Sequence, residues 1–116
     1  MVCVTVQRTC ERLIREGAKI AGEQGLSVVH VVKNGGAMLG GKSDEEALEY
    51  LYGISRAYGA EMDMLRSDDV LGTIATFARQ NDIAYLVIGA PKQRRHLNAS
   101  GSLQQKLPDV KVFVIP

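Results

Sequence analysis

The chain has 116 residues, of which 46% are hydrophobic and 23% charged, and its formal net charge at pH 7 is +1. This length suits one compact domain with one hydrophobic core, so we expect a single domain over residues 1–116. The composition is that of an average globular protein, which excludes a disordered or fibrous chain. The near-neutral charge argues against a nucleic-acid or membrane-surface partner.

The first residues, MVCVTV, are followed closely by the charged residues Arg8, Glu11 and Arg12, unlike a signal peptide. No apolar run approaches the roughly 20 residues that span a bilayer. Cys3 and Cys10 both fall on apolar positions, which favours structural thiols in a reducing compartment over a metal site. We therefore expect a cytoplasmic protein without a bound metal.

Two hydrophobic patterns alternate along the chain. Short apolar or β-branched runs predict strands at residues 2–6, 27–32, 60–65, 84–89 and 110–115. Between these runs, apolar residues recur at spacings of three and four, which predicts four helices. The chain therefore reads as five strands that alternate with four helices.

Helix-capping residues accompany the later helical patterns. Ser43 opens a capping box before the second helix. Ser67 or Asp68 can cap the third helix, because their short polar side chains accept hydrogen bonds from free amides. Ser100 or Ser102 can cap the fourth.

Alternating strands and helices predict a doubly wound α/β fold, with a parallel sheet, right-handed crossovers and helices on both faces. The runs at 27–32 and 84–89 are apolar almost throughout, which predicts central strands. In contrast, Ala60, Met62 and Met64 alternate with acidic residues, which predicts an edge strand. Ligands of such folds bind beyond the carboxyl ends of the central strands.

Residues 36–43, GAMLGGKS, match the P-loop pattern of two glycines separated by four residues and followed by Lys and Ser. Three residues separate this motif from the preceding strand, whereas a P-loop leaves its strand almost directly. The later apolar strand ends in Gly89, without the carboxylate that helps to hold magnesium. We favour a glycine-rich surface loop in which Ser43 caps a helix; the alternative is a P-loop ATPase that uses Lys42 and Ser43.

The loop after the fourth strand is a second candidate for phosphate binding. Gly89 ends that strand, Arg94 and Arg95 follow, and Gly101 with Ser102 opens a helix. Glycines permit close backbone approach, a helix start offers unpaired amides, and arginines make charge-assisted bonds to phosphate. The loop also lies where doubly wound folds bind ligands. The alternative is a solvated basic loop without a ligand.

The chain resembles a universal stress protein domain over almost its whole length, and more narrowly the version found in Kdp-type potassium-sensing histidine kinases. The similarity is carried by VCVTVQRTCERLIREGAKIA at the start, by GAEMDMLRSDDVLGTIATFARQNDIAYLVIG in the middle, and by GSL and VKVFVIP at the end. It implies a five-stranded parallel sheet with strand order 3-2-1-4-5. It also implies a homodimer through the last strand, from Val110 to Ile115, and other domains of a sensor kinase as partners.

Nucleotide-binding members of this family are similar in a Gly-x2-Gly-x9-Gly-Ser/Thr motif after the fourth strand, and in an Asp that ends the first strand and contacts adenine. This chain departs from both patterns. Lys92 stands at the second glycine, the Gly101-Ser102 pair arrives one residue early, and Thr5 occupies the position of the Asp. The resemblance implies the following cofactor-binding residues: Thr5, Val6, Val32, Gly89, Lys92, Arg94, Arg95, Gly101 and Ser102.

The departures count against tight ATP binding, because Lys92 lacks the backbone freedom of glycine and Thr5 cannot supply a carboxylate. No general base is poised for catalysis, so we assign no catalytic residue. We expect a non-catalytic regulatory or sensory domain in stress or potassium and osmotic signalling, which binds ATP, another adenine nucleotide or a dinucleotide. The alternative is a dimerising interaction module whose pocket has decayed.

Overall fold

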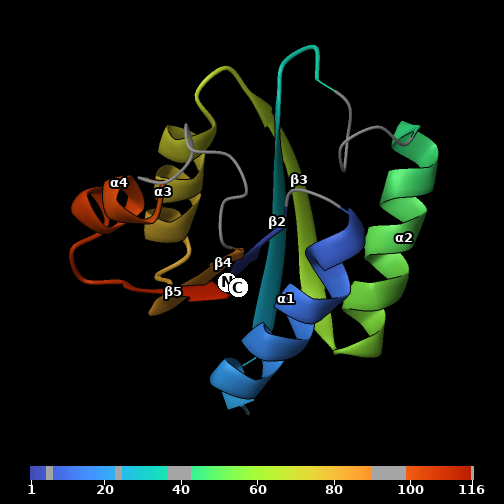
Figure 1. The fold of residues 1–116 in the computed structure, drawn as a ribbon, viewed down its shortest axis with the longest axis horizontal. Coiled ribbons are helices and arrows are strands. Elements are labelled where there is room, and N and C mark those ends of the chain that lie inside the picture. The colour runs from blue at the N-terminus through green and yellow to red at the C-terminus, as the bar shows by residue number, and fades with distance from the viewer. Residues whose placement is uncertain (5–6, 23–24, 37–42, 90–98, 116) are drawn as a thin grey trace.

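A computed structural model describes residues 1–4, 7–22, 25–36, 43–89 and 99–115. These residues form one five-stranded parallel sheet with helices on both faces (Figure 1). Across the sheet, the strands follow the order β3-β2-β1-β4-β5. The predicted doubly wound fold class and the strand order 3-2-1-4-5 are therefore confirmed.

Strands and helices alternate along the chain, as the hydrophobic pattern predicts. The strands are β1 (Val2–Cys3), β2 (Leu26–Lys33), β3 (Ala60–Ser67), β4 (Tyr85–Gly89) and β5 (Lys111–Ile115). The helices are α1 (Gln7–Ala21), α2 (Asp44–Ala57), α3 (Val70–Gln80) and α4 (Ala99–Lys106). The last two residues of the predicted first strand, 5–6, lie outside the described residues. Beyond Cys3, the amide of Val4 extends the pairing of β1 with β2 by donating to the carbonyl of Val29 at 3.0 Å.

The two faces of the sheet bury separate hydrophobic clusters. On β2, Val28 and Val32 belong to the cluster with α1 and α2, whereas Val29 and Val31 belong to the cluster with α3 and α4. Figure 1 shows these two pairs of helices on opposite sides of the sheet. Fully burying a side chain of this size contributes about 1.5–3 kcal/mol. The nearly continuous apolar run of β2 therefore reflects burial on both faces.

The outer strand β3 has the one-sided burial that its sequence predicts. It pairs with β2 alone, from Leu26 opposite Ala60 to Lys33 opposite Ser67. Met62 and Met64 are half-buried against the cluster under α1 and α2, whereas Glu61 and Asp63, which alternate with them, are exposed. The prediction that this segment is an edge strand is confirmed.

Helix starts follow the predicted chemistry in one case and differ in two. Ser43 caps α2, and its hydroxyl accepts a hydrogen bond from the amide of Glu46 at 3.2 Å. Helix α3 is capped by Asp69 instead of Ser67 or Asp68, because the hydroxyl of Ser67 is already engaged by the amide of Asp69 at 3.0 Å. The prediction that Ser100 or Ser102 caps the last helix is also wrong, because α4 begins at Ala99 and contains both serines.

Candidate functional site

The topological switch point of the sheet lies between β1 and β4. Strand β1 pairs with β2 on one side and with β4 on the other, where Val2 is opposite Val87. From β1 the chain builds outward through β2 to β3, and α3 then carries it back across to β4. Because the connections diverge there, the carboxyl ends of β1 and β4 are the expected binding crevice of such a fold.

The structure describes four of the nine predicted cofactor-binding residues. Gly89 ends β4 at this carboxyl edge, and Gly101 and Ser102 lie in the first turn of α4, the next helix along the chain. Gly101 is exposed and Ser102 half-buried. Val32 lies near the end of β2, but it is 5% exposed and packs in the cluster under α1 and α2. The remaining five predictions fall outside the described residues: Thr5, Val6, Lys92, Arg94 and Arg95.

The two described glycines of the predicted motif are not required by packing. Among the described residues, a Cβ atom at Gly89 would lie 3.5 Å from Cδ1 of Leu13, which is an ordinary contact, and a Cβ at Gly101 would meet nothing within 4 Å. Neither residue has a positive φ. Alanine would be more favourable in a helix than Gly101 by about 1 kcal/mol. Glycine at both positions is therefore suited to the close approach of another molecule.

Polar contacts join the carboxyl ends of β2 and β3. Asn34 donates from its amide to the carbonyl of Ser67 at 3.2 Å and from its side chain to Asp68 at 3.0 Å. The guanidinium of Arg66 donates to the carbonyl of Gly36 at 3.0 Å and to the carboxylate of Asp44 at 3.1 Å. The Arg66–Asp44 pair is exposed and contributes at most about 1 kcal/mol. These contacts tie the chain that leaves β2 to the neighbouring strand.

The described ends of the GAMLGGKS segment form structural contacts. Gly36 donates its amide to the carbonyl of Lys33 at 2.8 Å, and Ser43 caps α2. The first turn of α2 carries three consecutive acidic residues, starting at Asp44, where a phosphate would need positive potential. Lys42 falls outside the described residues. The cap at Ser43 and the acidic first turn of α2 are those of an ordinary helix start, and residues 37–42 of the segment lie outside the described residues.

His30, in the middle of β2, is a buried polar residue beside the switch point that the sequence predictions did not include. It is 3% exposed, and its Nδ1 atom lies 2.6 Å from the main-chain oxygen of Val4. The carbonyl can only accept, so this hydrogen bond requires a proton on Nδ1. Burial lowers the pKa of His30, an effect that outweighs the opposing contribution of the bond to Val4. The signal in the sequence was a histidine in the middle of the apolar run VVHVV of β2.

The cysteines are buried thiols, as the sequence predicts. Burial raises the pKa of Cys3 and of Cys10 to about 12, which suppresses the reactive thiolate. Within the described ranges, no group of three or more His, Cys, Asp or Glu residues converges as a metal site. None of the helices in this part of the chain has the length and apolar character of a membrane span.

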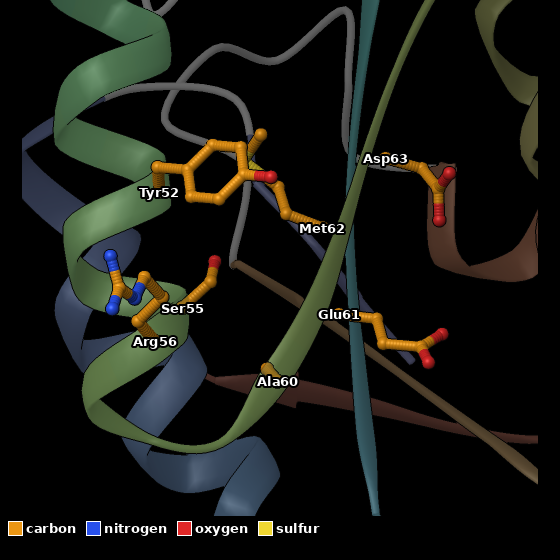
Figure 2. A pocket seen from close by; sticks show the side chains of 7 residues that line it. All are labelled: Tyr52, Ser55, Arg56, Ala60, Glu61, Met62 and Asp63. Atoms are coloured by element: carbon orange, nitrogen blue, oxygen red, sulfur yellow. The ribbon is translucent and has the colours of Figure 1, made fainter.

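Two cavities of the described residues lie away from the switch point. One, of about 410 Å³, is at the amino ends of the strands and includes Leu26 and Tyr85. The other, of about 320 Å³, is a groove between the second half of α2 and β3 (Figure 2). Neither cavity contains a predicted cofactor-binding residue.

The fold is similar to that of solved universal stress proteins. A universal stress protein from Archaeoglobus fulgidus in complex with dAMP matches with a TM-score of 0.65 and 26% sequence identity, over 99% of this chain and 94% of that chain. A second structure of a universal stress protein from Archaeoglobus fulgidus matches with a TM-score of 0.67 and 26% identity, over 99% and 90% of the two chains. No protein-family model and no curated protein matches the chain. The chain thus has the universal stress protein fold.

Proposed function

We propose that this protein is a regulatory domain of the universal stress protein type that binds an adenine nucleotide. The observation that carries this proposal is its similarity, over nearly the whole chain, to a universal stress protein solved with dAMP. The identity of 26% is accompanied by a similar fold, so the carboxyl ends of β1 and β4 are the corresponding place for a ligand.

In this proposal the phosphates lie against the loop that follows β4. Gly89 at the end of β4 and Gly101 in the first turn of α4 leave room for close backbone contacts, and the amides at the start of α4 carry partial positive charge. Arg94 and Arg95, from the connecting loop in the sequence, supply the charge that binds phosphate. Thr5 and Lys92, at the positions of the family's Asp and second glycine, make the site a modified one.

We further propose that the bound nucleotide is a signal and not a substrate. Three carboxylates near the carboxyl ends of β2 and β3 have structural roles: Asp44 pairs with Arg66, Asp68 bonds Asn34, and Asp69 caps α3. These roles leave them poorly suited to act as a general base. A regulatory domain of this kind fits a cytoplasmic setting in stress or potassium and osmotic signalling, including attachment to a sensor kinase of the Kdp type.

The direct test is a thermal-shift series with dAMP, AMP, ADP, ATP and cyclic dinucleotides. A nucleotide that binds the folded state raises the unfolding temperature. The Arg94→Ala, Arg95→Ala double variant should lose this shift. If no nucleotide stabilises the parent protein, the nucleotide proposal is wrong. ATP turnover by the parent protein that Lys42→Ala abolishes would instead support the P-loop alternative.

A matched pair of glycine variants locates the site. Gly101 and Gly53 both lie in helices, and a Cβ added at either would meet no atom of the described residues within 4 Å. Both Gly101→Ala and Gly53→Ala should therefore stabilise the free protein, by up to about 1 kcal/mol. Only Gly101→Ala should weaken nucleotide binding, because its methyl group would occupy the phosphate approach. Equal nucleotide affinity in the two variants would contradict this placement.

A second candidate function, a dimerising module, is favoured by the second edge of the sheet. Within the described part of the chain, strand β5 pairs with β4 alone, and its Val114 is 42% exposed. An uncovered edge with an exposed apolar side chain is suited to pairing with a second copy. Sedimentation should show a dimer for the parent protein and a monomer for Val114→Lys. Leu48→Lys, at a comparably exposed residue on α2, should remain dimeric.

A further inference from the structure

The groove between α2 and β3 combines a helix surface with an open strand edge. Tyr52, Ser55 and Arg56 of α2 line one side, and residues 60–63 of β3 line the other (Figure 2). Its volume is about 320 Å³. Tyr52 extends from the helix toward Met62, whereas the carboxylates of Glu61 and Asp63 lie on the opposite side of the strand. The two walls of the groove therefore differ in chemistry.

The main chain of β3 offers hydrogen-bonding groups to this groove. The carbonyl of Ser67 accepts from the amide of Asn34 in the chain that continues β2, so Ser67 turns its main chain toward β2. Main-chain groups alternate direction along a strand, so those of Met62 and Met64 turn toward the open edge. Since β3 pairs with β2 alone among the described strands, we take these groups as available to a further strand.

An exposed apolar surface on α2 and a buried hydroxyl accompany this strand edge. Among the described residues, three large hydrophobic side chains are exposed, and two of them, Leu48 at 37% and Tyr52 at 59%, lie one helical turn apart on α2. Ser55 is 1% exposed, and its hydroxyl has no hydrogen-bond partner in this part of the chain.

The charges around the edge select the occupant. Glu61 and Asp63 are exposed on one face of β3 and form no ion pair with the described residues, whereas Arg56 lies by Tyr52 at the other face. A strand added here would place alternate side chains beside Glu61 and Asp63, where basic residues are favoured. Its other side chains would meet Tyr52 and Met62, where apolar residues fit and Arg56 disfavours a basic one.

A second copy of the chain fits this edge poorly. Two β3 strands related by a two-fold axis through the sheet would place Glu61 and Asp63 of both copies on the same face. Four carboxylates would then be brought together across the new strand pair, which is destabilising. The charges thus protect the edge from self-pairing while leaving it open to a basic strand.

We propose that the groove between α2 and β3 binds an extended peptide segment with alternating basic and apolar residues, which pairs with the main chain of β3 as a sixth strand. Strand addition to an open edge beside a helix is a general mode of peptide recognition. The peptide site is separate from the carboxyl edge at β1 and β4, so the two ligands do not compete directly. The proposal makes this domain a docking module as well as a nucleotide-binding one.

The test is fluorescence anisotropy with a labelled peptide of sequence Lys-Val-Lys-Leu-Lys-Val-Lys. We expect the parent protein to bind it about tenfold more tightly than an isomer of the same composition with the four lysines grouped. Methylation of one alternate set of peptide amides should abolish binding, because that set donates to β3, and methylation of the other set should not. Equal binding of the two isomers, or equal effects of the two methylations, would overturn the proposal.

A matched charge reversal tests the role of the β3 face. Asp63→Lys should remove the preference for the basic peptide and favour one with glutamate in place of lysine. Asp109 is an exposed residue in the turn before β5, at the other edge of the sheet. Asp109→Lys makes the same charge change there and should leave the preference for the basic peptide unchanged. Both variants should unfold at temperatures close to that of the parent. If the two variants bind the basic peptide equally well, the proposed role of Glu61 and Asp63 in peptide binding is wrong, and their charges only prevent two β3 edges from pairing.

Discussion

The ring of His30 on β2 holds the end of β1 in place, because its Nδ1 donates a 2.6 Å hydrogen bond to the main-chain oxygen of Val4. The two residues are 26 positions apart in the chain. Val4 directly precedes Thr5, the predicted adenine-contacting position, so the contact lies at the switch point of the sheet. A core histidine therefore supports the backbone of the candidate nucleotide site.

This contact makes stability depend on pH. Burial lowers the pKa of His30 below its ordinary value of 6.5; the bond to Val4 opposes this effect, and the charge of Arg66 reinforces it. As pH falls through 6.5, the unfolded chain binds a proton that the folded protein does not yet bind. The free energy of unfolding should therefore fall, by at most about 1.4 kcal/mol per pH unit.

Urea denaturation at pH 7.5 and at pH 5.5 measures this dependence above the range in which most carboxylates titrate. The contribution should disappear in His30→Gln and persist in His96→Gln, which changes the other histidine of the chain. An identical pH dependence in His30→Gln and the parent protein would show that the two states of His30 have the same pKa.

Gly17 permits the close packing of α1 on β1. A Cβ atom there would overlap Cγ2 of Val2 and lie 3.3 Å from Cδ1 of Leu26. Gly17→Ala should lower the free energy of unfolding by about 1–3 kcal/mol, because buried overpacking forces a shift of the strand. Gly53→Ala in α2 is the control and should be stabilising. Equal stability changes in chemical denaturation would contradict the tight α1–β1 contact.

Replacing Ser55 in α2 or Ser43 at its N-cap with alanine should change the stability of the protein in opposite directions. The hydroxyl of Ser55 is buried without a partner among the described residues, whereas that of Ser43 caps the helix. Ser55→Ala should stabilise the protein by about 1 kcal/mol, because it removes an unsatisfied polar group. Ser43→Ala should destabilise it by about 1 kcal/mol. Unfolding midpoints that move in the same direction would argue against one of these assignments.

The start of α3 can be tested with two adjacent aspartates. The side chain of Asp69 accepts from the amide of Gly72 at 3.1 Å, whereas Asp68 bonds the exposed side chain of Asn34. Asp69→Ala should cost about 1 kcal/mol of stability, and Asp68→Ala less. If urea denaturation shows a larger loss of stability for Asp68→Ala than for Asp69→Ala, Asp68 and not Asp69 caps α3.

The two thiols should be unreactive in the folded protein. With a pKa of about 12, each cysteine has about one thiolate in ten thousand molecules at pH 8. Modification by a disulfide reagent should therefore be slow without denaturant and should reach both cysteines in urea. Rapid modification of either thiol under native conditions would show that its surroundings open readily.

Much of the architecture could be predicted from local patterns. The alternation of Met62 and Met64 with acidic residues identified β3 as an edge strand, because side chains of a strand alternate between faces. Ser43 could be assigned as a cap because its partner, the amide of Glu46, is three residues away. Such features depend on neighbours in the sequence, and the structure confirms them.

Other features depended on hydrogen bonds and packing that are formed only in the folded chain. Asp69 caps α3 because Ser67, at the end of β3, is held by hydrogen bonds of its own, one of them from Thr73 at 2.6 Å. Val32 matched the candidate site by position, yet the packing of α1 and α2 on the sheet buries it.

By itself, the sequence determined the order of strands and helices, the edge strand β3 and the cap of α2, since periodicity and capping act over a few residues. Only the tertiary structure decided that His30 bonds Val4 and that Tyr52 and Ser55 form a groove with β3. The first contact requires strand register to bring together residues 26 positions apart, and the groove requires the packing of α2 beside the edge strand that follows it. No local pattern contains that information.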